Sequence, residues 1–170
     1  MDASYSNCFE TPRDFTRYET IRDQVLEQYA KIAWLPLRVD ALAHTSMVDS
    51  YITLLAQKRG LPLELAKIAA ILHDYARYHN NIGKGHAKAG AKKAKDLLEE
   101  MGLFSSEEIW TIVNAIGNHS KKELVHDPLD EALKDADTLA YWAMHPQEAP
   151  SFIRQNRLEI CFKELGLPIF

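Results

Sequence analysis

The chain has few cysteines, no long apolar segment and little net charge, and each shortage excludes a class of protein. Its two cysteines, Cys8 and Cys161, lie far apart without CxxC spacing, so we expect reduced thiols rather than a disulfide framework. No run approaches the ~18 consecutive apolar residues of a membrane span, and no basic segment followed by an apolar one suggests a secretory signal. The net charge of −4 gives no sign of a nucleic-acid groove or an anionic membrane partner. These features predict a cytoplasmic protein with no membrane partner, and nucleic acid is an unfavoured ligand.

Strand-like alternation is also missing, and apolar residues recur at helical spacing instead. The pattern predicts an all-α fold, a compact bundle of about seven helices in a single domain over residues 1–170. The expected helices cover about 13–33, 39–59, a stretch from 63 into 73–74, then 86–101, 105–119, 129–143 and 151–165. We expect the core of the domain at about 38–143, with the N-terminal and C-terminal helices packed on it.

One stretch, residues 69–77, combines an apolar helical run with two adjacent metal-ligand types, His73 and Asp74. Neighbouring residues on a helix point about 100° apart, so both side chains reach one spot comfortably only at a helix end. Gly83 and Gly85 follow soon after and favour such an end. An imidazole beside a carboxylate suits iron, manganese, nickel or zinc. The pair therefore predicts part of a metal site.

Further potential ligands lie on other predicted helices or helix ends: His44, His86, His119 and Asp137. Each histidine alone has an ordinary explanation, because His44 could be a core residue, His86 a cap or loop residue, and His119 a partner of the helix dipole. Asp137 interrupts an apolar helix, where a buried unpaired carboxylate would be costly. Facing helices of a bundle each offer one side chain to the interior, so we interpret the whole set as one shared metal site.

The order of His44, the His73-Asp74 pair and the final Asp137 resembles the HD-domain superfamily of metal-dependent phosphohydrolases. The last residue lies in an Ala-Asp-Thr-Leu segment that is similar to the terminal pattern of that superfamily. His86, after Gly85, and His119 resemble the extra ligands of the two-metal subgroup, which includes the bacterial symmetrical dinucleoside-tetraphosphate hydrolases. The resemblance covers about residues 38–143 and implies the HD-domain fold.

Two departures from that subgroup leave the substrate open. Arg38 lies six residues before the first histidine, farther than the arginine that the subgroup usually carries close to it. A Ser-Lys-Lys segment follows His119 in place of the usual turn.

The resemblance also implies a set of roles. Two divalent metals per chain would be bridged by Asp74, one held also by His44, His73 and Asp137, the other by His86 and His119. Iron is the metal implied first, with manganese, nickel or zinc as alternatives. The implied reaction is hydrolysis of a nucleotide or other small phosphoester or phosphoanhydride by a metal-activated hydroxide.

Basic residues near these ligands could bind phosphate. Arg77 could fork onto phosphate oxygens, although a surface salt bridge explains it equally well. Lysines that could line a polyphosphate path are Lys84, Lys88, Lys121 and Lys122. The predicted catalytic set is Asp74, His73, Arg77 and Lys121.

Two alternatives use the same ligands, namely a non-catalytic HD module that binds metal or nucleotide, and a di-iron HD-type oxygenase. The expected partner is a small phosphorylated substrate, and the oligomeric state is open.

Overall fold

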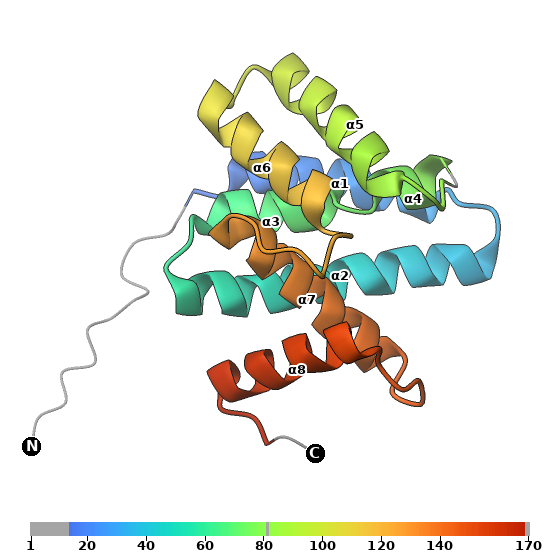
Figure 1. Cartoon of the computed structure of the whole chain (residues 1–170). Helices are drawn as coiled ribbons and strands as arrows, with labels where there is room; N and C mark the ends of the chain where they lie inside the picture. Colours follow the sequence, from blue (N-terminus) through green and yellow to red (C-terminus); the bar gives the residue numbers. More distant parts are fainter. Residues whose placement is uncertain (1–13, 81, 169–170) are drawn as a thin grey trace, which may run out of the picture.

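The computed structural model describes residues 14–80 and 82–168, so Cys8 and the predicted start of the first helix at residue 13 lie outside it. Within these ranges the chain forms eight helices and no strand (Figure 1), which confirms the all-α prediction. The helices are α1 (Thr16–Ala30), α2 (Leu35–Arg59), α3 (Leu63–Leu72), α4 (Tyr75–Asn80), α5 (His86–Met101), α6 (Ser106–Asn118), α7 (Pro128–Met144) and α8 (Phe152–Leu165).

The helical run expected from residue 63 onwards is divided in two, which accounts for the additional helix. His73 and Asp74 form the junction between α3 and the short α4. A second boundary also differs, since α2 begins at Leu35 rather than near residue 39. Pro36 lies in the first turn of α2, where its missing N–H has no intrahelical partner to lose, so proline starts this helix rather than delaying it.

Helix α3 lies at the centre of the bundle. It contacts α1, α2, α6 and α7, and six of its ten residues are buried. Its sequence is apolar on most faces, as a helix surrounded by others requires. The buried isoleucines, Ile68 and Ile71, each contribute roughly 1.5–3 kcal/mol through the apolar surface they remove from water. The junction that follows α3 is therefore held inside the protein rather than on its surface.

Two pairs of helices flank this centre, and α1 and α8 pack singly (Figure 1). Helices α5 and α6 pack against each other on one side, and α2 packs against α7 on the other. Helix α1 covers α3, and α8 lies against α7, where Phe162 packs on Trp142; the buried residues of α8 are Leu158, Cys161 and Phe162. Cys161 is a buried free thiol.

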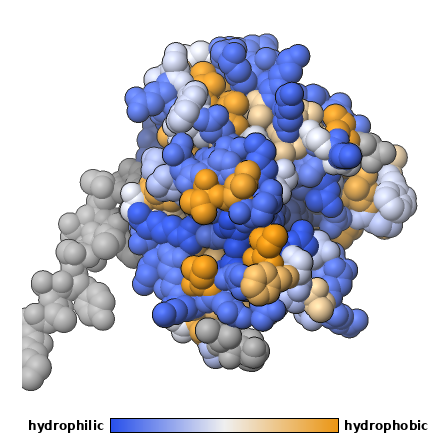
Figure 2. All heavy atoms as spheres, in the orientation of Figure 1, coloured by the Kyte–Doolittle hydropathy of each residue, from blue (hydrophilic) through white to orange (hydrophobic). Residues whose placement is uncertain are grey.

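The face in Figure 2 is mainly hydrophilic, with hydrophobic side chains in small separate groups. None of the helices in the described ranges has both the length and the apolar character that crossing a membrane requires.

Candidate metal centre

The junction between α3 and α4 turns two consecutive side chains toward the same point. His73 and Asp74 are only 0% and 2% exposed, and His73 Nε2 lies 3.6 Å from Asp74 Oδ2. Helix α4 resumes directly, with the Tyr78 amide donating to the Asp74 carbonyl at 3.1 Å. The interruption is thus confined to the two residues that carry the potential ligands.

Helix α5 approaches this junction closely because Gly90 has no side chain. A Cβ at this position would lie 3.2 Å from the carbonyl oxygen of His73, tighter than ordinary contact. The start of α5 depends on Gly85, whose φ of +81° is disfavoured for other residues. Together the two glycines place His86, the first residue of α5, with Nε2 3.3 Å from Asp74 Oδ1.

The other predicted ligands come from three more helices. His119 caps the C-terminal end of α6, and its Nε2 lies 3.5 Å from Asp74 Oδ1. His44 projects from α2, with Nε2 3.1 Å from Asp137 Oδ1 of α7 and 3.8 Å from Asp74 Oδ2. The structure therefore brings together all six residues: His44, His73, Asp74, His86, His119 and Asp137.

These contacts form two groups that could each hold a metal ion, and Asp74 belongs to both. One group is His44, His73 and Asp74, and the other is Asp74, His86 and His119. Within each group one ligand atom per residue lies within 4.8 Å of the others, which suits metal–ligand bonds of ~2.0–2.2 Å. Asp137 adjoins the first group through His44.

Hydrogen bonds to the main chain fix the tautomer of three of the histidines. The Nδ1–H groups of His73, His86 and His119 donate at 2.7 Å to carbonyl oxygens three residues earlier in the chain. A carbonyl oxygen only accepts, so Nδ1 carries the proton and Nε2 presents its lone pair. Metal-bound histidines typically have this arrangement.

The histidine Nε2 atoms and Asp74 Oδ1 lie close together, in an arrangement that a bound cation would stabilise. His73 Nε2 lies 3.3 Å from His44 Nε2, and His86 Nε2 lies 3.2 Å from His119 Nε2. Asp74 Oδ1 is buried and has no hydrogen-bond donor among the described residues. Such a carboxylate oxygen is costly unless a cation compensates it. The residues present fit divalent metal ions with nitrogen and oxygen ligands.

The electrostatic environment keeps these ligands in the forms that bind metal. Burial lowers the pKa of His73 to about 4, so its imidazole is neutral near pH 7. Burial alone would raise the pKa of Asp74, but the nearby His73 and His119 hold it well below its usual range. The Lys122 ammonium likewise outweighs burial and depresses the pKa of Asp137. Both carboxyl groups are therefore ionised at neutral pH.

The metal-ligand cluster opens onto a cavity of about 340 Å³. Two of its cations face the carboxylates, since Arg77 Nη1 donates to Asp74 Oδ2 at 3.0 Å and Lys122 Nζ to Asp137 Oδ2 at 2.6 Å. Lys121 lies elsewhere, because it is exposed and its Nζ donates to Asn118 Oδ1 at 3.0 Å. The lysine that lines the cavity is therefore Lys122, and not Lys121 of the predicted catalytic set. Lys84 and Lys88 are also exposed.

Helix α8 supplies residues that the sequence analysis did not name. Arg154 lines the cavity, and Arg157 donates to the carbonyl of Lys122 from Nε at 3.0 Å and from Nη2 at 2.8 Å. Arg157 Nη1 also donates to Asp135 at 2.7 Å, which fixes α8 to α7. No local sequence motif marks these arginines, because only the packing of α8 on α7 brings Arg154 to the cavity and Arg157 to the Lys122 carbonyl.

Comparisons with known proteins give a family match and a similarity in fold. Residues 41–142 match the family model described as HD domain, and this range holds all six predicted ligands. A crystal structure described as a predicted HD superfamily hydrolase, from an uncultured Thermotogales bacterium, is similar in fold with a TM-score of 0.61. The two chains are 24% identical, and the alignment covers 87% of this chain and 88% of the other. No curated protein matches the chain.

Proposed function

Because the chain belongs to the HD-domain family, we propose that it is a metal-dependent phosphohydrolase that cleaves a small phosphoester or phosphoanhydride, such as a nucleotide. The observation that carries this proposal is the pair of ligand groups that share Asp74 beside a cavity lined by Arg77 and Lys122. A phosphate group needs both features, since its oxygens carry negative charge that cations stabilise during cleavage.

We assign two metals to each chain. Asp74 would bridge them, His44, His73 and Asp137 would complete one site, and His86 and His119 the other. Iron is the first choice, and manganese, nickel or zinc would also suit these donors. When bound, such metals supply Lewis acidity toward phosphate oxygens and lower the pKa of a water molecule toward neutrality.

The two cations of the cavity would hold the substrate. Arg77 offers a planar fork that binds two phosphate oxygens at once, and its 44% exposure leaves it accessible to a ligand. Lys122 is confined, with 11% of its side chain exposed and with Asp137 beside it, so it acts as a fixed charge on the cavity wall. His73 and Asp74, as buried ligands, have a positional role and would not transfer protons to the substrate.

Metal analysis combined with a phosphate-release screen tests the proposal. The protein is purified without oxygen, its metals are counted, and phosphate release from nucleotides and simple phosphoesters is measured with iron or manganese. We expect Asp74→Asn to lose both metal and activity. Asp49→Asn is the matched control, because Asp49 is a partly buried carboxylate that pairs with Lys67 at 2.8 Å and does not line the cavity.

Two outcomes would contradict parts of the proposal. If wild-type protein releases no phosphate from any compound with either metal, the hydrolase assignment is wrong. If one metal binds per chain and the variants His86→Ala and His119→Ala keep it, the two-metal assignment is wrong.

A further inference from the structure

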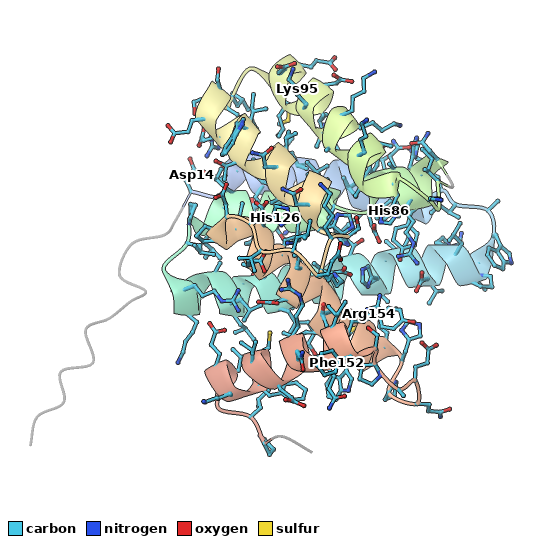
Figure 3. All side chains as sticks on the ribbon, viewed as in Figure 1. Asp14, His86, Lys95, His126, Phe152 and Arg154 are labelled. Carbon is cyan, nitrogen blue, oxygen red and sulfur yellow. The ribbon has the colours of Figure 1, made fainter. Side chains whose placement is uncertain are left out.

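One wall of the cavity lies outside the segment that matches the family. The family match ends at residue 142, whereas Ser151, Ile153 and Arg154 of the following segment line the same cavity as the ligands Asp74 and His86. Figure 3 labels His86 at the start of α5 and Arg154 on α8, two helices far apart in the sequence. This wall is therefore formed in part by a segment that the family match does not include.

The cavity offers more room than a single phosphate group needs. Its volume of about 340 Å³ corresponds to roughly ten water molecules at ~30 Å³ each. A substrate held at the metal ligands would thus extend toward the α8 wall, where its remaining groups would meet Arg154.

Arg154 differs from Arg77 and Lys122 because it has no acidic partner among the residues that the structure describes. Arg77 and Lys122 each form an ion pair with a metal-ligand carboxylate. No carboxylate in the described part of the chain lies within ion-pair distance of Arg154. The Glu148 carboxylate, from the loop before α8, instead accepts the Tyr141 hydroxyl. The guanidinium therefore has its charge available for a ligand, together with the donor groups that its hydrogen bond with the Tyr141 side chain does not use.

An aromatic stack holds this guanidinium in place. Its carbon lies 4.1 Å from the ring centroid of Tyr141, which itself stacks on His145 with ring centroids 4.3 Å apart. A guanidinium on an aromatic face gains a favourable cation–π interaction and keeps its edge N–H groups available. Those edge groups match the two oxygens of a phosphate or carboxylate.

We infer that Arg154 is a specificity-determining residue that binds a second anionic group, a phosphate or a carboxylate, on the substrate whose phosphoester is held at the metal ligands. This inference rests on the proposed function for the position of the first phosphate. It predicts that compounds with two anionic groups are preferred over simple phosphomonoesters.

Binding of non-hydrolysable probes tests the inference without requiring turnover. The manganese-loaded protein is titrated calorimetrically with propyl phosphonate, with carboxyalkyl phosphonates, and with alkane bisphosphonates of two to five carbons. We expect at least one probe with two anionic groups to bind about tenfold to a hundredfold more tightly than propyl phosphonate, as charge-assisted hydrogen bonds to an arginine would give. Tighter binding of the bisphosphonates would identify the second group as a phosphate, and tighter binding of the carboxyalkyl phosphonates would identify it as a carboxylate.

Variants then assign this preference to Arg154. Arg154→Gln should abolish it and leave the affinity for propyl phosphonate within about twofold, and Arg154→Lys should retain part of it. Arg22→Gln is the control, because Arg22 forms a surface ion pair with Asp23 on α1 and does not line the cavity. Circular dichroism and melting temperature check that all variants are folded.

The inference is overturned if wild-type protein shows no preference, or if Arg154→Gln weakens all probes equally. A protein that shows the predicted preference but releases no phosphate from any ester would instead contradict the proposed hydrolase function. The two failures are therefore distinguishable.

Discussion

Replacing Lys122 by methionine should destabilise the metal-free protein far more than the metal-loaded one. Lys122 Nζ lies 2.6 Å from Asp137 Oδ2, and the two side chains are only 11% and 16% exposed. Removing one partner of a buried ion pair costs roughly 3–5 kcal/mol, because the other charge stays buried without compensation. We expect a loss of about 3 kcal/mol, at the lower end of that range, because both side chains keep some contact with water.

A bound divalent cation changes this cost. It would neutralise Asp137 in place of the lysine, so the same substitution should cost only about 1 kcal/mol in the loaded protein. The substitution would thus cost about 2 kcal/mol less in the loaded protein than in the metal-free one. Because coupling is reciprocal, the free energy of metal binding must become more favourable by the same amount. Lys122→Met should therefore bind metal roughly 30-fold more tightly than wild type. It should also release phosphate roughly 100-fold more slowly, since a cation that stabilises the transition state is gone.

Urea unfolding with and without manganese, together with metal titration, measures both quantities. Lys121→Met is the matched control, because Lys121 is exposed and its Nζ donates to Asn118 Oδ1 rather than to a metal-ligand carboxylate. Its unfolding free energy should stay within about 0.5 kcal/mol of wild type. Equal losses for Lys122→Met with and without metal, or an equal loss for the control, would refute the reasoning.

Two further predictions concern packing and acid stability. Gly90→Val should lower the metal content, because even a Cβ at this position would lie 3.2 Å from the His73 carbonyl oxygen. Gly117→Ala should keep the metal, because its Cβ would make an ordinary contact at 3.6 Å. Metal analysis of the two variants tests this difference. Burial alone would raise the pKa of Glu131, but the hydrogen bond from Lys134 outweighs burial and leaves the pKa below the ordinary value of 4.5. The ionised Glu131 therefore stabilises the folded protein above pH 4.5. This stabilisation is lost as the pH falls through the lowered pKa. The stability difference between wild type and Glu131→Gln should therefore narrow between about pH 6 and pH 3 in urea titrations, and a constant difference would contradict this.

The fold class could be predicted, and candidate ligands could be proposed, because local rules of sequence bear on both. Apolar periodicity reports helices directly, and Asp137 within an apolar helix has few explanations that do not involve a cation. The division of one predicted helix at His73 and Asp74 follows from the same reasoning, since adjacent ligands need a helix end.

The cavity wall could not be predicted because it depends on how helices pack. Lys121 and Lys122 are adjacent lysines, and nothing in the sequence favours one over the other as the neighbour of Asp137. The path of the chain after α6 decides that Lys122 faces it. Arg154 and Arg157 follow the turn after α7, so the direction in which α8 returns decides that Arg154 lines the cavity and that Arg157 reaches the Lys122 carbonyl. Periodicity reports which face of a helix is buried but not which neighbour covers it.

The most direct test of the metal centre is a crystal structure of protein loaded with iron or manganese, with anomalous scattering data at the metal edge. The proposal predicts two peaks per chain, each within ~2.0–2.2 Å of an Asp74 carboxylate oxygen. One peak should also adjoin His44 and His73, and the other His86 and His119. A single peak, or peaks that do not contact Asp74, would contradict the shared two-metal centre on which the proposed chemistry depends.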